Sequence, residues 1–173
     1  MISKTIVVAI AVAMSACAAR TQNGTASSVA ASSAAFDQYA TFSFGFSDPP
    51  EPGYQVTTRS LEVQRRLRGI VKSRLERAGY VESPQSSDFV VKLATGMVAP
   101  TKPNRDVERS EPTPALGYIG VHLYDAQTAS MILQGSAVAE IDPAHIDDAL
   151  LERGVEHMLS GLPTARKKLA ASN

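Results

Sequence analysis

Two kinds of hydrophobic spacing divide the chain into short strands and two helices. Phe42, Phe44 and Phe46 alternate with small or polar residues, which is typical of a strand with one buried face. We predict this first strand within residues 36–46. The three prolines among residues 49–52 end it, because proline donates no hydrogen bond to a neighbouring strand.

The spacing changes to a helical period over residues 57–78. Apolar residues there recur at steps of three and four, which predicts a helix with one buried stripe. Thr58 or Ser60 is expected to cap its start, and Gly79 stands where a left-handed residue commonly follows a helix. The predicted stripe consists of Leu67, Ile70, Val71, Leu75 and Ala78, joined in the first turns by Leu61 and Val63.

Three further strands are predicted at residues 88–95, 118–125 and 131–141, and the last two form a hairpin. Gly135 in the final strand indicates a bulge or a close approach of another backbone. The connection of residues 97–116 is unusually long for a compact domain. We therefore expect it to be a mobile loop or to cross the sheet edge.

A second helix is expected to begin at Asp142, with Pro143 in its first turn, and to end before Pro163. Its predicted apolar stripe is Leu151, Val155, Met158, Leu159 and Leu162.

The order strand, helix, strand, strand, strand, helix predicts an α+β fold. We expect a single two-layer domain with a mostly antiparallel sheet of about four strands and two helices packed on one face. The domain is predicted to span residues 36–163, and residues 164–173 form a loose basic tail. The expected core joins Phe42, Phe44, Val91, Leu93, Val121 and Leu123 of the sheet to Leu67, Val71, Leu75, Val155 and Leu159 of the helices.

Composition and charge exclude several classes of protein. A chain of 173 residues that is 44% apolar has the size and composition of one globular domain, which excludes disorder throughout. Its 17 basic and 17 acidic residues balance, so a bulk nucleic-acid binder is excluded. A single cysteine excludes an intrachain disulfide.

The first 16 residues have the pattern of a secretory signal peptide. Residues 6–14 are apolar and uncharged, and as a helix they would extend roughly 14 Å, which is too short to span a bilayer. The run Met14-Ser15-Ala16-Cys17 then resembles the bacterial lipobox, with Met14 where leucine is most common. The alternative is an ordinary secretory signal in which Cys17 is incidental.

A lipidated Cys17 would anchor the mature chain to a membrane, because two or more acyl chains hold a protein there stably. By resemblance to enterobacterial sorting, Ala18 after the cysteine favours the outer membrane, with the domain facing the periplasm. Residues 17–35 are mostly small and polar, which predicts a flexible tether.

The first predicted helix is strongly basic. Arg65, Arg68 and Lys72 lie at spacings of three and four, so they project from one side of it as a docking site for an anionic envelope component. The alternative is an ordinary solvated helix face. The basic residues of this helix are Arg59, Arg65, Arg66, Arg68, Lys72, Arg74 and Arg77, against Glu62 and Glu76.

Tyr118, His122 and Tyr124 share the less apolar face of the third predicted strand, where they would bind a ligand or a peptide. The alternative is a half-exposed sheet face, or the far side of a two-layer fold. An envelope hydrolase that uses His122 with a carboxylate such as Asp125 is the other functional class. The absence of any nucleophile, phosphate-loop or dinucleotide motif favours a non-catalytic module.

No metal or cofactor is predicted. His145 and His157 lie twelve residues apart on one predicted helix, more than three turns, so they cannot share an ion.

Short segments in a fixed order resemble a known family. They are 36–42, Leu75 with 78–80, 87–91, 120–126 and 134–137, and together they resemble the bacterial envelope lipoproteins of the domain of unknown function 4136 family. The resemblance implies this fold and an envelope location, and it supplies no active site. Family members often carry tryptophan where this chain has Leu133.

The sequence thus predicts a membrane-anchored, non-catalytic binding or structural module. Its expected partners are the membrane, through the lipid on Cys17, and an envelope protein or cell-wall component.

Overall fold

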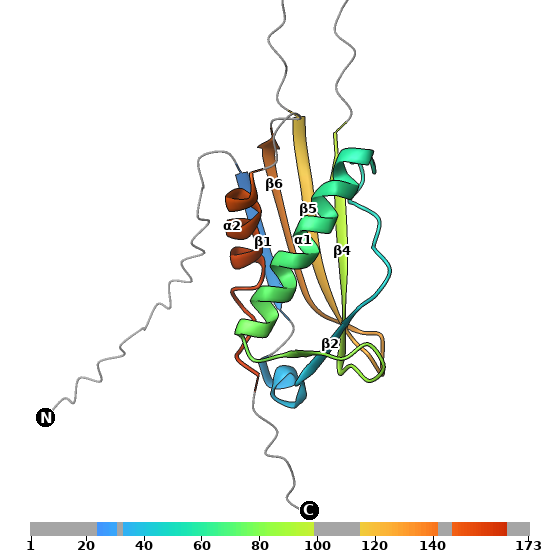
Figure 1. Ribbon diagram of the computed structural model, residues 1–173, viewed down its shortest axis with the longest axis vertical. Helices are drawn as coiled ribbons and strands as arrows, with labels where there is room; N and C mark the ends of the chain where they lie inside the picture. Colours follow the sequence, from blue (N-terminus) through green and yellow to red (C-terminus); the bar gives the residue numbers. More distant parts are fainter. Residues whose placement is uncertain (1–23, 31–32, 99–114, 142–146, 166–173) are drawn as a thin grey trace, which may run out of the picture.

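The computed structural model describes residues 24–30, 33–98, 115–141 and 147–165. Within these ranges one six-stranded sheet carries the helices α1 (Thr58–Arg77) and α2 (Asp148–Met158) on one face, as Figure 1 shows. The strands are β1 (Gly24–Ala30), β2 (Thr41–Phe44), β3 (Val81–Glu82), β4 (Phe89–Met97), β5 (Ala115–Asp125) and β6 (Met131–Ile141), and a 3-10 helix, η1, spans Ser33–Gln38.

The sheet is mixed, with the strand order β1-β6-β5-β4-β2-β3. Strand β2 pairs in parallel with β3 and β4, whereas the pairs β4–β5, β5–β6 and β6–β1 are antiparallel. Helix α1 carries the chain back to the end at which β2 began, so the next strands run in the direction of β2. The α+β class and the two helices on one face are confirmed, but the expected number of about four strands is wrong.

Strand β1 corrects the prediction that residues 17–35 are a flexible tether and that the domain starts at residue 36. Gly24 lies opposite Ala139 of β6, and the pairing continues to Ala30 opposite Leu133. Backbone hydrogen bonds hold this strand, and they do not need large apolar side chains. Val29 is 72% exposed, which explains why hydrophobicity gave no signal here. Residues 17–23 lie outside the described ranges.

The first predicted strand is shorter than expected. Phe36 is buried in η1, and β2 includes Phe42 and Phe44 but ends there. Phe42 is fully buried and Phe44 packs against the core, whereas Phe46 is 96% exposed. The alternation therefore gave the correct face for two phenylalanines and the wrong environment for the third.

Helix α1 begins one residue earlier than its predicted caps imply. Thr57 is the N-cap, and its side chain and that of Ser60 each accept a hydrogen bond from the other's backbone N–H. The predicted stripe is confirmed except at Leu61, which is 50% exposed. Gly79 follows the helix at φ +94°, as predicted.

Helix α2 begins at Asp148 with Asp147 as its N-cap, rather than at Asp142. Residues 142–146, like 99–114 of the long connection and 166–173 of the basic tail, lie outside the described ranges. The apolar stripe predicted for α2 is confirmed, because all five of its residues are buried: Leu151, Val155, Met158, Leu159 and Leu162.

The core lies between the helices and one sheet face. All the residues predicted for it belong to one buried cluster or pack against it. Leu133 is buried in the same cluster. No helix in the described ranges has the length and apolar character needed to cross a membrane.

Candidate functional site

The sheet face opposite the helices is partly covered by residues 45–57, which we name the strap. The strap follows the edge of β4: Gly45 N donates to Val91 O at 2.9 Å, and Asp48 N donates to Leu93 O at 3.0 Å. Near the end of β4, Gln55 and Met97 exchange two backbone hydrogen bonds of 2.9 Å. The strap therefore protects an edge that would otherwise be unpaired beyond β2.

Asp48 of the strap connects three side chains on the covered face, and we name the four residues the Asp48 cluster. The Asp48 Oδ2 atom lies 2.8 Å from His122 Nδ1 and 2.8 Å from the Tyr124 hydroxyl. Lys92 Nζ on β4 lies 3.5 Å from Asp48 Oδ1. Backbone and side chain of one aspartate thus fasten the strap to two adjacent strands.

The charges in the cluster favour an ionised Asp48. Burial alone raises the pKa of Asp48, but hydrogen bonds from His122 and Tyr124 and the charge of Lys92 outweigh it and lower the pKa. An ionised carboxylate only accepts hydrogen bonds, so His122 donates through Nδ1. Burial and the neighbouring Asp48 raise the pKa of Tyr124 to about 12.

The second ring nitrogen of His122 is buried and makes no hydrogen bond. It lies beside Gly120, where a Cβ would be 3.2 Å from Nε2 and 2.9 Å from the Tyr118 hydroxyl. Tyr118 is 2% exposed, and its ring centre lies 5.1 Å from that of Tyr54 in the strap, with the two rings tilted by 37°. Burial and the charge of Glu51 raise the pKa of Tyr118 to about 12.

The three residues of the predicted binding face therefore lie where the alternation put them, but under the strap. Tyr118 and His122 are buried, and only Tyr124 stays partly exposed. This face is the far side of a two-layer fold, which was one of the alternatives, but it is not half-exposed because strap residues such as Tyr54 and Pro50 cover part of it.

The carboxylate beside His122 is Asp48 and not Asp125. The Asp125 side chain accepts from the Tyr39 hydroxyl at 2.6 Å and from backbone N–H groups of Gln127 and Thr128 in the hairpin turn. These hydrogen bonds lower the pKa of Asp125 to about 2. An Asp48–His122 pair holds an imidazole in one orientation, but no hydroxyl or thiol of the described residues is hydrogen-bonded to Nε2.

Sequence reasoning missed Asp48 because it stands 74 residues before His122, in a proline-rich break with no periodicity. The only signal for it was an acidic residue at the end of a strand.

The predicted docking residues are brought together, but acidic partners lie among them. Glu82 of β3 forms an ion pair with Lys72, in which Oε2 lies 2.5 Å from Nζ. The other carboxylate oxygen of Glu82, Oε1, lies 3.9 Å from Arg68 Nη2. The Arg68 guanidinium also stands 4.2 Å from the centre of the Phe44 ring. Arg65 is exposed and makes no ion pair within the described part of the chain.

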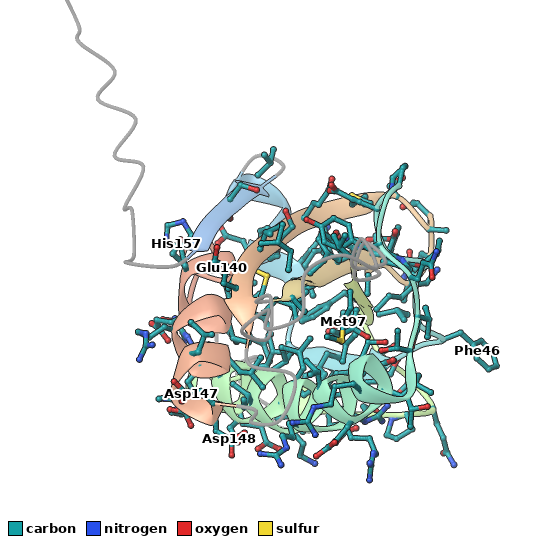
Figure 2. All side chains as sticks on the ribbon, turned by 90° about the horizontal axis from the view of Figure 1, so that it is seen from above. Phe46, Met97, Glu140, Asp147, Asp148 and His157 are labelled. Carbon is teal, nitrogen blue, oxygen red and sulfur yellow. The ribbon has the colours of Figure 1, made fainter. Side chains whose placement is uncertain are left out.

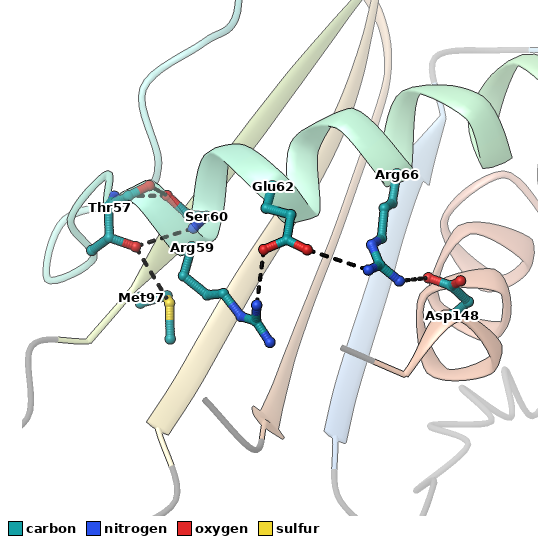
Figure 3. A network of polar contacts seen from close by, with 7 residues as sticks. All are labelled: Thr57, Arg59, Ser60, Glu62, Arg66, Met97 and Asp148. Carbon is teal, nitrogen blue, oxygen red and sulfur yellow. Dashed lines mark hydrogen bonds and ion pairs between the residues drawn. The ribbon is translucent and has the colours of Figure 1, made fainter. Parts of the chain in front are cut away.

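Other basic residues of α1 connect it to its surroundings, as Figure 3 shows. Glu62 accepts from Arg59 at 2.8 Å and from Arg66 at 3.2 Å, and Arg66 also reaches Asp148 at the start of α2 at 2.9 Å. Exposed ion pairs of this kind each contribute about 0–1 kcal/mol. Much of the positive charge read from the sequence is therefore paired locally.

The start of α1 is held to the end of β4 by the N-cap. The Thr57 hydroxyl donates to Met97 Sδ at 3.5 Å and accepts from Ser60 N at 3.1 Å, as drawn in Figure 3.

Across the described ranges, no group of three His, Cys, Asp or Glu side chains is arranged to hold a metal ion.

A family model described as "Domain of unknown function (DUF4136)" matches residues 26–164. The chain belongs to this family. The match begins within β1, in agreement with the domain start that the sheet defines. No curated protein matches the chain.

Solved structures share the fold of this DUF4136 protein at low sequence identity. PelC from Paraburkholderia phytofirmans, crystallised as a dodecamer, is 14% identical, with a TM-score of 0.53 over 83% of this chain and 99% of that chain. A DUF4136 family protein from Bacteroides thetaiotaomicron is 14% identical, with a TM-score of 0.51 over 80% and 95%. A PDZ domain protein from Parabacteroides distasonis is 11% identical, with a TM-score of 0.54 over 83% of this chain and 37% of that chain.

Asp48→Asn is expected to destabilise the DUF4136 domain by about 1–3 kcal/mol at pH 7, because it removes the charge to which His122, Tyr124 and Lys92 are directed. The folded-state pKa of Asp48 is lowered, so its contribution is full above the unfolded pKa of about 4 and is lost as pH falls through the folded value. Urea unfolding between pH 7 and pH 3 measures the difference in the free energy of unfolding between the unmutated protein and Asp48→Asn. This difference should become smaller in acid. The exposed substitution Glu152→Gln serves as the control.

Proposed function

We propose that this DUF4136 protein is a lipid-anchored module of the bacterial cell envelope that faces the periplasm from the outer membrane. It binds an envelope protein or a cell-wall component and catalyses no reaction. The observation that carries the proposal is Cys17 in its lipobox-like setting, seven residues before the first strand of the domain at Gly24. A domain that begins so close to the anchor is held near the membrane surface.

The Asp48 cluster supports a non-catalytic role. A general base must reach a substrate proton, directly or through one water. The free nitrogen of His122 is buried beside Gly120, close to the Tyr118 side chain, whose ring in turn contacts Tyr54 of the strap. The cluster fastens the strap, which is a structural task.

Cys17→Ser is expected to abolish incorporation of labelled palmitate, because serine has no thiol for the lipid. The measurement is metabolic labelling of cells that express the full chain, followed by separation of inner and outer membranes. The unmutated protein should carry label in the outer-membrane fraction, and Ser15→Ala, which keeps a small residue at that position, should label equally. Label on the Cys17→Ser protein would contradict the anchor.

A hydrolase remains the second candidate because His122 and Asp48 have the orientation of a base and its supporting carboxylate. Hydrolysis of activated esters or of cell-wall fragments by the purified chain, lost in His122→Gln, would replace the non-catalytic proposal.

A further inference from the structure

Three large apolar side chains are left uncovered around the start of α1. Phe46 of the strap is 96% exposed, Val56 is 56% exposed and Leu61 is 50% exposed. Figure 2 shows Phe46 pointing away from the body of the domain. Single exposed apolar residues are ordinary, but neighbouring ones mark a contact surface.

Local contacts indicate that these residues belong to one surface. A hydrogen bond between the Ser47 and Gln64 side chains holds the strap beside the second turn of α1, next to Phe46 in sequence. Val56 and Leu61 occupy the positions before the N-cap and four residues after it, which commonly pack together at a helix start. We name Phe46, Val56, Leu61 and Arg65 the α1 entry patch.

The charge of this patch is positive. Arg65 has no acidic partner in the described ranges, in contrast to Arg68 and Lys72, which share Glu82. The first turn of α1 holds no acidic residue, so the positive end of the helix dipole adds to the charge of Arg65. An apolar surface beside unpaired positive charge is complementary to an anionic lipid surface.

The register of the sheet brings this patch within reach of the lipid anchor. One row of paired residues crosses the sheet from the start of α1 to the start of β1: Gln55, Met97, Gly117, Ala139 and Gly24. Four strand spacings make this row about 19 Å wide. Residues 17–23 extend at most roughly 23–25 Å, so Cys17 can reach the membrane plane that the patch touches.

We propose that the α1 entry patch rests on the same anionic membrane that holds the lipid of Cys17. Phe46 and Leu61 enter the headgroup region, and Arg65 pairs with lipid phosphates. The proposal takes its membrane from the proposed anchor, but the contact itself does not need the lipid. Of the three basic residues predicted from the sequence for docking, it keeps Arg65 and adds the apolar residues that the structure exposes beside it.

The test uses the mature chain, residues 17–173, with Cys17→Ser, because every described element begins at residue 24 or later. Co-sedimentation with phosphatidylcholine vesicles, with and without phosphatidylglycerol, measures binding. We expect binding only with phosphatidylglycerol, weakened by salt. Arg65→Gln should weaken it about fivefold, and the pair Phe46→Ala with Leu61→Ala at least tenfold.

Matched controls lie at the far end of the domain. Val81 is 61% exposed on β3, and Arg77 is exposed in the last turn of α1, so Val81→Ala and Arg77→Gln remove comparable groups outside the patch. Both control proteins should bind like the unmutated chain. Patch variants that bind as well as these controls would overturn the proposal, and so would an unmutated chain that ignores phosphatidylglycerol.

Failure of the patch and failure of the anchor give different results. Palmitate on Cys17 without vesicle binding by the Cys17→Ser chain would refute the patch and leave the anchor in place. Vesicle binding without palmitate labelling would refute the anchor and leave the patch in place. Self-association without lipid that the patch variants abolish would assign the patch to a second copy of the chain, and the membrane contact would be wrong.

Discussion

Leu75→Ala is expected to lower the free energy of unfolding by about 2–5 kcal/mol. Leu75 is fully buried in α1 and belongs to the cluster between the helices and the sheet. Its truncation removes apolar contacts and leaves a cavity that the surrounding strands can only partly fill. Equilibrium unfolding in urea, followed by circular dichroism, measures the change.

The matched control is the same substitution at Leu61, on the same helix but 50% exposed. Leu61→Ala should change stability much less than Leu75→Ala, because little area returns to water when it is truncated. Equal losses for the two variants would contradict the register of α1 and, with it, the packing of the helix on the sheet.

Gly135→Ala is expected to lower stability by about 1–3 kcal/mol, because it forces backbone atoms apart. A Cβ on Gly135 would lie 2.6 Å from Met158 Cβ, 2.9 Å from Met158 O and 3.0 Å from Met158 Cα. The last turn of α2 would have to move away from β6. The sequence predicted a bulge or a close approach of another backbone at Gly135, and the contact with Met158 is such an approach.

Gly69→Ala in α1 is the opposite case, since a Cβ there meets no atom within 4 Å. It should raise stability by up to about 1 kcal/mol, because alanine has the higher helix propensity. Thermal unfolding of both variants tests the pair. A stable Gly135→Ala protein would show that α2 moves away from β6 without loss.

Periodicity predicted those elements whose side chains alternate between core and solvent. Strand β6 has the predicted bounds, and the stripes of α1 and α2 are the buried faces of those helices. Strand β1 was missed because small residues fill it and backbone hydrogen bonds hold it. The direction of β2 was missed because spacing within a strand carries no information about which neighbour it pairs with.

The candidate site was predictable only in part. Alternation placed Tyr118, His122 and Tyr124 on one face of β5, since that depends only on their positions in one strand. The strap that covers them, and the Asp48 that joins two of them, come from a segment without periodicity. Glu82 likewise reaches Lys72 only through the fold, ten residues along the chain.

In the exported, lipid-anchored protein that we propose, the position of β1 delays completion of the sheet. Ser27 meets Ser136, 109 residues later, so in an exported chain β1 would join the sheet only after β6 had emerged. The described side chains of β1, those of residues 27–29, contribute nothing to the buried core. While β1 is undocked, residues 17–30 can extend at most roughly 46–50 Å. This is about twice the reach of residues 17–23, which are left between Cys17 and the sheet once β1 has docked. In the lipid-anchored protein that we propose, docking of β1 would therefore draw the domain toward the bilayer.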